Sequence, residues 1–336
     1  MSHPNVTDLV LAGDVGGTKT VLGVFAQGEG RPMPQVTATY ASAEYPSLAA
    51  LLDRFLDAHQ VTVSAACFGI PGPVVGGRSA LTNLPWDVSE ASLAAHLGCP
   101  RVRLINDLTA TALAVPLLRG SELSDLNRGK PDPQGNIGVM APGTGLGVGL
   151  LIRVSGQLRP SASEGGHVDF APTSEKQVEL WRFLREEMPH VSIERLISGP
   201  GLENIYKWMR CSREIAEPQW LTDRMRTEDP AKVISETALS RSDSVCVDAL
   251  DEFVSILGAS AGNLALSVMA TGGIYLGGGI CPKILEKLHE GRFMEAFSDK
   301  GRFRELLEKV PVRVVLNDKA ALLGAASAAC ENFSGK

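Results

Sequence analysis

The sequence lacks the features that mark several large classes of protein. Its six cysteines are scattered singly with no Cys-x-x-Cys pair, which argues against a zinc site or a disulfide framework and favours a reducing cytoplasm. No run of Lys and Arg resembles a nucleic-acid footprint, so we expect no nucleic-acid partner. Residues 1–10 have neither the basic segment nor the apolar core of a signal peptide, so we expect no cleaved leader.

Composition indicates a globular protein. The 336 residues suggest about two domains at roughly 150 residues each. With 44% hydrophobic and 21% charged residues, bulk disorder is excluded, and the net charge of −6 favours solubility without identifying a substrate. Glycine accounts for 35 residues, about 10% of the chain, against an ordinary share of about 7%. Because these glycines gather in short loops, we expect backbone that approaches a ligand closely.

The hydrophobic pattern predicts an α/β protein. Short apolar runs predict strands at 9–13, 21–25, 61–70, 102–105, two around 142–145 within 136–154, 273–276 and 312–315. Helical spacing predicts helices at 48–59, 93–97, 109–118, through most of 175–266, from 282, and at 318–329. The polar segment 122–135 is the clearest candidate boundary between domains. A strand–glycine turn–strand pattern at 9–25 returns at 137–152, which hints at two related halves.

One segment has the length of a membrane span. Residues 253–282 carry no charge, but they contain seven glycines and Asn263. A buried helix, a glycine break and a buried strand explain this segment better, so we expect no membrane partner.

Three familiar motifs fail on context. Gly13 to Thr20 resembles a P-loop, but Thr18 stands where that motif needs glycine, and the turn leads into a strand. The second glycine loop, at 143–147, lacks the spacing of a dinucleotide-binding turn. Gly258-Ala-Ser260-Ala-Gly262 matches the nucleophile elbow of serine hydrolases, yet its flanks look helical. Small residues at helical spacing more often mark close helix packing.

Three glycine-rich loops predict a nucleotide site. In the first, consecutive small residues free backbone N–H groups for phosphate oxygens, and Asp14 adds a carboxylate that would hold Mg²⁺ directly or through water. The second repeats this logic with Thr144 as a donor, and the third offers a flat wall for a purine. A bare β-turn is the alternative for the first loop, and a crowded strand-to-helix turn is the alternative for the third. The residues are Gly13, Asp14, Val15, Gly16, Gly17, Thr18 and Lys19; Gly143, Thr144 and Gly145; and Gly277, Gly278 and Gly279.

Two further sets are polar. Asn106 and Asp107 end a predicted strand, where ligand crevices of α/β proteins lie, and Asp107 could accept a proton from a hydroxyl or could cap the next helix. The dipeptide alone favours the cap. Glu164, His167 and Asp169 flank glycines and are followed by Glu194. These side chains suit hydrogen bonds to a polyol, and exposed loop charge is the alternative.

The segments GDVGGTKT, GIPGP, LTNLPW, INDLTA, APGTGLG, SEGGHVDFAP, ERLISGPGL and GGIYLGGGI together resemble the bacterial glucokinases of the hexokinase type. The match runs in order over nearly the whole chain, from about Leu9 to Gly324. SEGGHVDFAP and ERLISGPGL are specific, whereas the glycine loops occur throughout the actin-like ATPase superfamily. The resemblance implies a two-domain ribonuclease-H-like, actin-like ATPase fold with an active-site cleft between the domains. It implies ATP-dependent phosphorylation of the glucose 6-hydroxyl with Mg²⁺.

The resemblance assigns roles by position. It makes Asp107 the general base and places Asp14 near the metal. Residues 13–18 match the family's first phosphate loop, 143–145 match its second, and 277–279 match its adenosine segment. It assigns the sugar hydroxyls to Asn83, Asn106, Asp107, Glu164, His167 and Glu194. It also implies a small domain of residues 1–117 and 316–336, a large domain of 118–315, and a cytoplasmic homodimer.

Alternatives remain open. The same hydroxyl ligands would serve mannose, glucosamine or an N-acetylated hexose. A non-enzymatic sugar sensor would need a lost base or phosphate loop, whereas Asp14, Asp107 and Thr144 are all present. The related repressor/kinase group carries a cysteine-rich zinc motif after its histidine, and here no cysteine follows His167 in that position.

Overall fold

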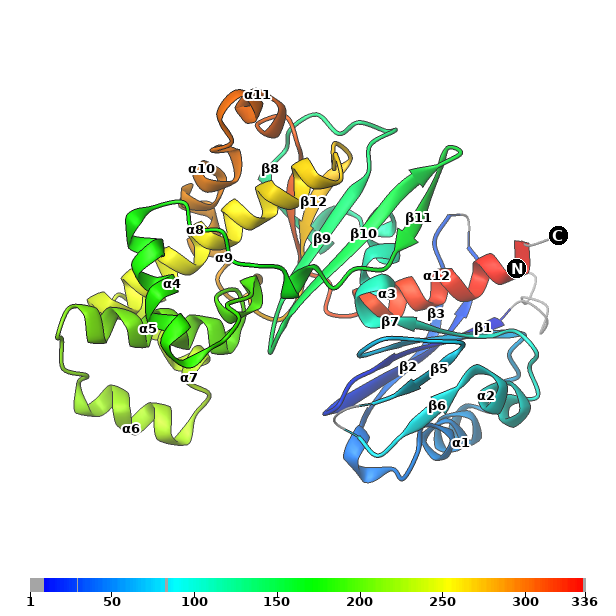
Figure 1. Ribbon diagram of the computed structural model, residues 1–336. Helices are drawn as coiled ribbons and strands as arrows, with labels where there is room; N and C mark the ends of the chain where they lie inside the picture. Colours follow the sequence, from blue (N-terminus) through cyan, green and yellow to red (C-terminus); the bar gives the residue numbers. More distant parts are fainter. Residues whose placement is uncertain (1–8, 29, 82–83, 335–336) are drawn as a thin grey trace. The chain divides into compact units, whose positions relative to one another are not determined.

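The computed structural model describes residues 9–28, 30–81 and 84–334, which form two compact units (Figure 1). Unit 1 comprises Met1–Gly120 and Asn317–Lys336, and unit 2 comprises Ser121–Leu316. Each unit has its own central sheet and its own apolar core. The α/β class expected from the sequence is confirmed.

The sheet of unit 1 has the strand order β3-β2-β1-β4-β7. β2 pairs antiparallel with β1 and β3, whereas β4 pairs parallel with β1 and β7. A separate two-stranded sheet contains β5 (Arg78–Ala80) and β6 (Asp87–Ser89). The main strands are β1 (Leu9–Val15), β2 (Lys19–Ala26), β3 (Met33–Ala41), β4 (Ala65–Ile70) and β7 (Val102–Asn106).

Helices cover both faces of this sheet. α3 (Asp107–Ala114) and α12 (Ala320–Ser334) lie side by side on one face, and α1 (Leu48–His59) and α2 (Glu90–Leu97) lie on the other (Figure 1). Successive side chains of a strand point to opposite faces. Val10 of β1 therefore joins the core beneath α12, while Leu11 joins the core beneath α1.

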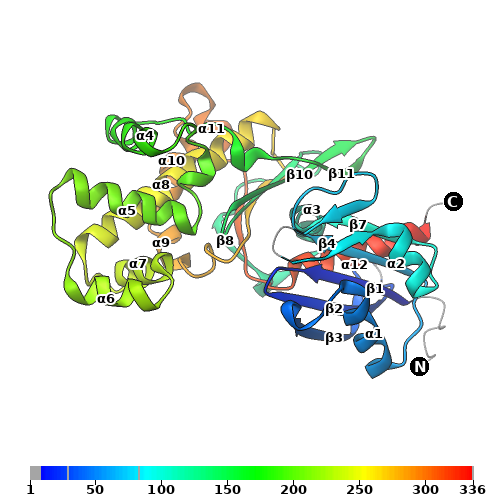
Figure 2. The same ribbon diagram turned by 60° about the horizontal axis from the view of Figure 1, so that its bottom comes forward.

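The sheet of unit 2 has the strand order β11-β10-β9-β12-β13-β8. Its strands are β8 (Leu123–Asn127), β9 (Ile137–Pro142), β10 (Leu146–Val154), β11 (Gln157–Ser161), β12 (Gly273–Leu276) and β13 (Val312–Val315). The helices of unit 2 gather beside this sheet, at the left of Figure 2. The helices are α4 (Glu175–Glu187), α5 (Gly199–Ser212), α6 (Gln219–Thr227), α7 (Pro230–Leu239), α8 (Ser244–Ser267), α9 (Leu285–His289), α10 (Arg292–Ser298) and α11 (Arg304–Leu307).

The two sheets repeat one plan. In each, an antiparallel hairpin (β1–β2 or β9–β10) carries a further antiparallel strand on one side and two parallel strands on the other. Unit 2 adds β8 at the edge. The glycine turns that suggested two related halves are therefore the turns of the two equivalent hairpins.

Several expected boundaries need correction. Strand β4 begins at Ala65 rather than at 61, and α3 begins at Asp107 rather than at 109. The helix expected from 282 begins at Leu285, because the segment before it forms turns. The polar segment 122–135 contains β8, which lies at a sheet edge and needs little apolar pattern.

The uncharged segment 253–282 consists of the C-terminal part of α8, a turn, β12 and the turns that follow this strand. Within the residues that the structure describes, no helix is long and apolar enough to cross a membrane. Ser260 lies in the middle of α8, so the strand that a hydrolase elbow needs is absent there. A Cβ on Gly258 or Gly262 would overlap the carbonyl oxygens of Phe293 and Phe297, which shows that these glycines serve close packing of α8 against α10.

The contact between α3 and α12 supplies a stability prediction. A Cβ on Gly324 would overlap the carbonyl oxygen of Ala110. Alanine ordinarily stabilises a helix by about 1 kcal/mol relative to glycine, but overpacking costs about 1–3 kcal/mol. We expect Gly324→Ala to lower the free energy of unfolding, measured by urea denaturation. Gly199→Ala is the control, because its Cβ would make only van der Waals contacts at 3.5 and 3.6 Å. A Gly324→Ala variant as stable as wild type would contradict the packing argument.

Candidate active site

The first glycine loop is the hairpin turn between β1 and β2. Gly13, Asp14 and Val15 end β1, Lys19 begins β2, and the Gly16 N–H donates to the Lys19 carbonyl over 3.0 Å. A Cβ on Gly13 would lie 2.5 Å from the Phe68 ring, so the buried core under the loop requires glycine there. Residues 16–18 join the two strands at the end of the sheet, and of their backbone N–H groups the one of Gly16 is engaged within the turn.

A buried serine outside any recognised motif holds this turn. The Ser42 hydroxyl donates to the Gly16 carbonyl over 2.7 Å, and the Ser42 N–H donates to the Thr18 carbonyl over 3.1 Å. Because the Ser42 hydroxyl proton is engaged at Gly16, the Thr20 hydroxyl is the donor in the 2.9 Å contact between the two side chains. Ser42 and Thr20 are fully buried. No motif surrounds Ser42, so sequence reasoning missed it.

Asp14 and Asp107 lie at the carboxyl ends of strands in one sheet. Asp14 is opposite Gly69 of β4, and the next β4 residue is opposite Asn106 of β7. A Cβ on Gly69 would lie 3.7 Å from the Asp107 Cα and 3.1 Å from the Ala110 Cβ, so glycine admits α3 here. Burial, and then the charge of Asp107, raise the pKa of Asp14 to about 6, while Lys19 opposes the shift.

Asn106, rather than Asp107, is the N-cap of α3. Its side-chain oxygen accepts the N–H groups of Leu108 and Thr109 at 2.9 and 3.3 Å, and its amide donates to the Gly72 carbonyl over 3.1 Å. The cap reading of Asp107 is corrected, because Asp107 is the first helical residue. Asp107 accepts the Leu108 N–H over 2.8 Å through one carboxylate oxygen.

The second glycine loop is the corresponding turn of unit 2. Gly143 donates to the Gly145 carbonyl, and its own carbonyl accepts the Gly199 N–H at the start of α5, both over 2.8 Å. Among the described residues, and apart from its chain neighbours, no heavy atom lies within 4 Å of the position that a Cβ would take on Gly143. The third glycine segment lies beside this loop, because Gly277 donates to the Met140 carbonyl and Ile280 donates to the Pro142 carbonyl. Gly278 has φ +74°, and a Cβ there would overlap the Pro142 carbonyl oxygen.

Glu194 contacts the residue after the second glycine loop and also lies beside His167. Its Oε2 accepts the Leu146 N–H over 2.8 Å, and a Cβ on Gly145 would lie 2.6 Å from that oxygen. Its Oε1 is 3.9 Å from Nδ1 of His167, and both side chains line a cavity of about 540 Å³. Glu164 stands at the N-terminal end of the short 3₁₀ helix Gly165–His167 and is exposed. Glu194, His167 and the loop are therefore one local cluster, with Glu164 on the same segment as His167.

All the predicted site residues except Asn83 lie within the described part of the chain. Thr18, Lys19 and Thr144 are exposed near their turns. Among the described residues, no group of three or more His, Cys, Asp or Glu side chains has an arrangement that could hold a metal ion.

Comparison with known proteins decides the family. The glucokinase family model matches residues 11–332. The chain belongs to the glucokinase family. It is 38% identical to the glucokinase of Nostoc punctiforme, over 95% of this chain and 98% of that protein. It is also 38% identical to the glucokinase of Cronobacter sakazakii, over 95% of this chain and 96% of that one.

Solved structures agree with this membership of the glucokinase family. A glucokinase from an Antarctic psychrotroph has a TM-score of 0.88 at 33% identity and covers 96% of this chain and 99% of that chain. A ROK-family glucokinase from Streptomyces griseus, solved with glucose and AMPPNP, has a TM-score of 0.65 at 23% identity and covers 96% of this chain and 99% of that one. The expected actin-like ATPase fold is confirmed, and the chain is a kinase of the glucokinase family.

The raised pKa of Asp14 predicts how stability depends on pH. Because the pKa of Asp14 is higher in the folded state than its ordinary value, folding takes up a proton between about pH 4 and 6. The stabilisation that goes with this proton is lost as the pH rises through about 6. Without Mg²⁺, Asp14→Asn should be more stable than wild type at pH 8, by up to about 3 kcal/mol for about two pKa units. The advantage should vanish at pH 4.

Thermal unfolding in EDTA at both pH values measures this difference. Asp87→Asn is the matched control, because the Asp87 side chain is 66% exposed and should gain nothing. An Asp14→Asn variant that is no more stable than wild type at pH 8 would show that burial and the charge of Asp107 do not disfavour the ionised form of Asp14.

Proposed function

We propose that this protein transfers the γ-phosphoryl group of ATP to the 6-hydroxyl of glucose, with Asp107 as the general base. The observation that carries the proposal is that Asp14 and Asp107 lie near each other at the glycine hairpin of unit 1. Together they would supply a general base and a carboxylate that can bind a cation beside one proposed phosphate loop. Family membership and the relatives named glucokinase support the substrate. ATP is supported by the AMPPNP complex of the Streptomyces griseus protein.

Asp107 is suited to the role of base. One of its oxygens accepts the Leu108 N–H, which fixes the carboxylate at the start of α3. Asp107 would take the proton of the sugar 6-hydroxyl as that oxygen bonds to phosphorus. Asn106 uses its oxygen as the helix cap and one amide hydrogen at Gly72, which leaves its second amide hydrogen for a sugar hydroxyl.

The remaining residues position the substrates. Glu164, His167 and Glu194 would bind sugar hydroxyls, and Asn83 keeps the same role as a proposal from the sequence. Backbone N–H groups that the turns within 13–19 and 143–145 do not use themselves would bind phosphate oxygens, and the flat segment at 277–279 would lie against the adenosine. Catalysis would then come mainly from positioning and electrostatics.

The environment of the Asp14 carboxylate suits a divalent cation. A half-buried carboxylate whose charge is disfavoured by Asp107 gains from a nearby positive charge. Asp14 would hold Mg²⁺ directly or through water, and the ion would neutralise charge on the ATP phosphates. We propose further that the protein acts as a cytoplasmic homodimer in glycolysis, and sedimentation of the purified protein tests the dimer.

Replacement of Asp107 tests the base. We expect Asp107→Ala to reduce kcat by about 10²-fold or more, in an assay that couples glucose 6-phosphate to NADPH formation. Since Asn106 caps α3, the substitution leaves the helix cap in place. Asp87→Ala is the control and should keep wild-type activity.

Each adverse outcome has its own meaning. Equal turnover by the Asp107→Ala variant and wild type would remove Asp107 from the chemistry. No turnover of glucose by folded wild type would overturn the glucose assignment, and mannose, glucosamine and N-acetylated hexoses would then be assayed.

Replacement of Ser42 tests the first phosphate loop. Ser42→Ala removes the hydrogen bond to Gly16, so the loop loses part of its preorganisation. One hydrogen bond is worth about 1 kcal/mol, so we expect the KM for ATP to rise roughly 5-fold while the KM for glucose stays unchanged. Ser47→Ala is the matched control: it removes the N-cap of α1, which should lower stability without changing either KM. A Ser42→Ala variant with an unchanged KM for ATP would refute the role.

A further inference from the structure

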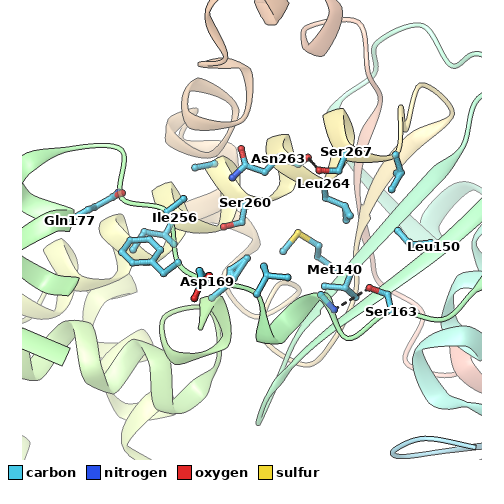
Figure 3. A pocket seen from close by; sticks show the side chains of 18 residues that line it. Met140, Leu150, Ser163, Asp169, Gln177, Ile256, Ser260, Asn263, Leu264 and Ser267 are labelled. Atoms are coloured by element: carbon cyan, nitrogen blue, oxygen red, sulfur yellow. Dashed lines mark hydrogen bonds between the residues drawn. The ribbon is translucent and has the colours of Figure 1, made fainter. Parts of the chain in front are cut away.

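Unit 2 contains an apolar cavity that the proposed reaction does not use. Its volume is about 280 Å³, and it lies between α8, the sheet residues Met140, Val148 and Leu150, and the segment that includes Ser163 and Val168 (Figure 3). On α8, a stripe that includes Ile256, Ser260, Asn263 and Ser267 faces this space, whereas Gly258 and Gly262 pack against α10. The cavity is therefore bounded by a rigid helix, a sheet and a loop.

One hydroxyl group in the cavity wall has no protein partner among the described residues. Ser260 is 7% exposed, and its hydroxyl makes no hydrogen bond among the described residues. Figure 3 shows its side chain on the α8 face that lines the cavity. The other inner polar groups are engaged: Gln177 with Thr173 and Glu252, and Ser163 with Gly165. Solvent reaches the Ser260 oxygen through the cavity, so a ligand hydroxyl would take the place of water as its partner.

The dimensions and the lining define the occupant. An apolar cavity of about 150 Å³ in another protein holds benzene, so 280 Å³ accommodates a substituted ring. The mouth is polar at Asn263 and Ser267, both exposed, while Val168 presents apolar surface that is 54% exposed and would be covered by a ligand. These features suit a compact, mostly apolar molecule with one hydroxyl group.

The loop wall connects the cavity to the proposed sugar site. Ser163, Gly165 and Val168 line the cavity, and Glu164 and His167 lie between them in the sequence. A ligand that packs against Val168 and Phe170 would restrain the segment that carries both proposed sugar ligands. Restraint before hexose binding lowers the entropy cost of that binding.

We propose that this cavity binds a small phenol-type molecule and that its occupancy tightens hexose binding. The second half rests on the proposed function, because it assigns Glu164 and His167 to the sugar. The Ser260 hydroxyl bonds the hydroxyl of the ligand, and the ring fills the space between α8 and Val168.

The first experiment measures binding of phenol and toluene to the full chain by ligand-observed NMR, without ATP. We expect phenol to bind with a dissociation constant of about 1 mM or below. Ala259→Leu places a larger side chain in the cavity and should abolish binding of both compounds. Ser260→Ala should change the ratio of the phenol and toluene dissociation constants by about 2- to 10-fold, against phenol. Ser255→Ala, on the same helix but outside the lining, should change nothing.

The second experiment measures coupling to the hexose. In calorimetry, saturating phenol should lower the dissociation constant of glucose by about 5-fold or more, and glucose should tighten phenol by the same factor. Ala259→Leu should abolish the effect of phenol. If glucose does not bind at all, the proposed function fails, whereas the NMR experiment still decides whether the cavity is a site.

Four results would overturn all or half of the proposal. Absence of phenol binding removes the site, and binding that Ala259→Leu leaves intact places the ligand elsewhere. A dimer that covers the cavity, shown by sedimentation in which Ala259→Leu weakens the dimer, assigns this face to a second copy of the chain. Phenol binding with an unchanged glucose dissociation constant removes the regulatory half.

Discussion

The close approach of α3 to the sheet at Gly69 is the constraint on which the chemistry of unit 1 depends. Glycine there lets the start of α3 lie against β4, and the parallel pairing of β1, β4 and β7 brings Asp14 and Asp107 to one edge. Burial, and after it the charge of Asp107, disfavours the ionised form of Asp14, as its raised pKa shows. The proposed site, which would bind a cation and remove a proton, needs this arrangement, so the proposal implies that some stability is given up for function.

The repeated sheet plan explains why the glycine loops occur in pairs. Each loop is the turn of the antiparallel hairpin in its own sheet, so a ligand group at one turn has an equivalent place at the other. The local supports differ. Ser42 holds the turn of unit 1 from a neighbouring segment, whereas Glu194 accepts the Leu146 N–H after the turn of unit 2. Glu194 also lies beside His167, so in unit 2 the proposed phosphate loop and the proposed sugar residues share one side chain.

Sequence pattern predicts the elements whose stability comes from apolar burial. Helix α1 and strands β12 and β13 have the predicted bounds, because each presents an apolar stripe or run between clear breaks. Strands β3 and β8 escape prediction, because edge pairing rather than burial holds their polar residues. Family motifs point to Asp107, Glu194 and the glycine loops, but Ser42 lies in none of them and acts only through neighbours distant in sequence. Gly69 begins the motif GIPGP, yet its contact with α3 is seen only in the fold. The cap of α3 was assigned one residue late for a related reason, since both Asn106 and Asp107 are good caps.

The most direct test of the central claim is ³¹P NMR of the products formed from ATP, Mg²⁺ and glucose. The account predicts one phosphate ester, at the 6-position of glucose, for each ADP, with little inorganic phosphate. Inorganic phosphate without a sugar ester, or an ester at another hydroxyl, would contradict it.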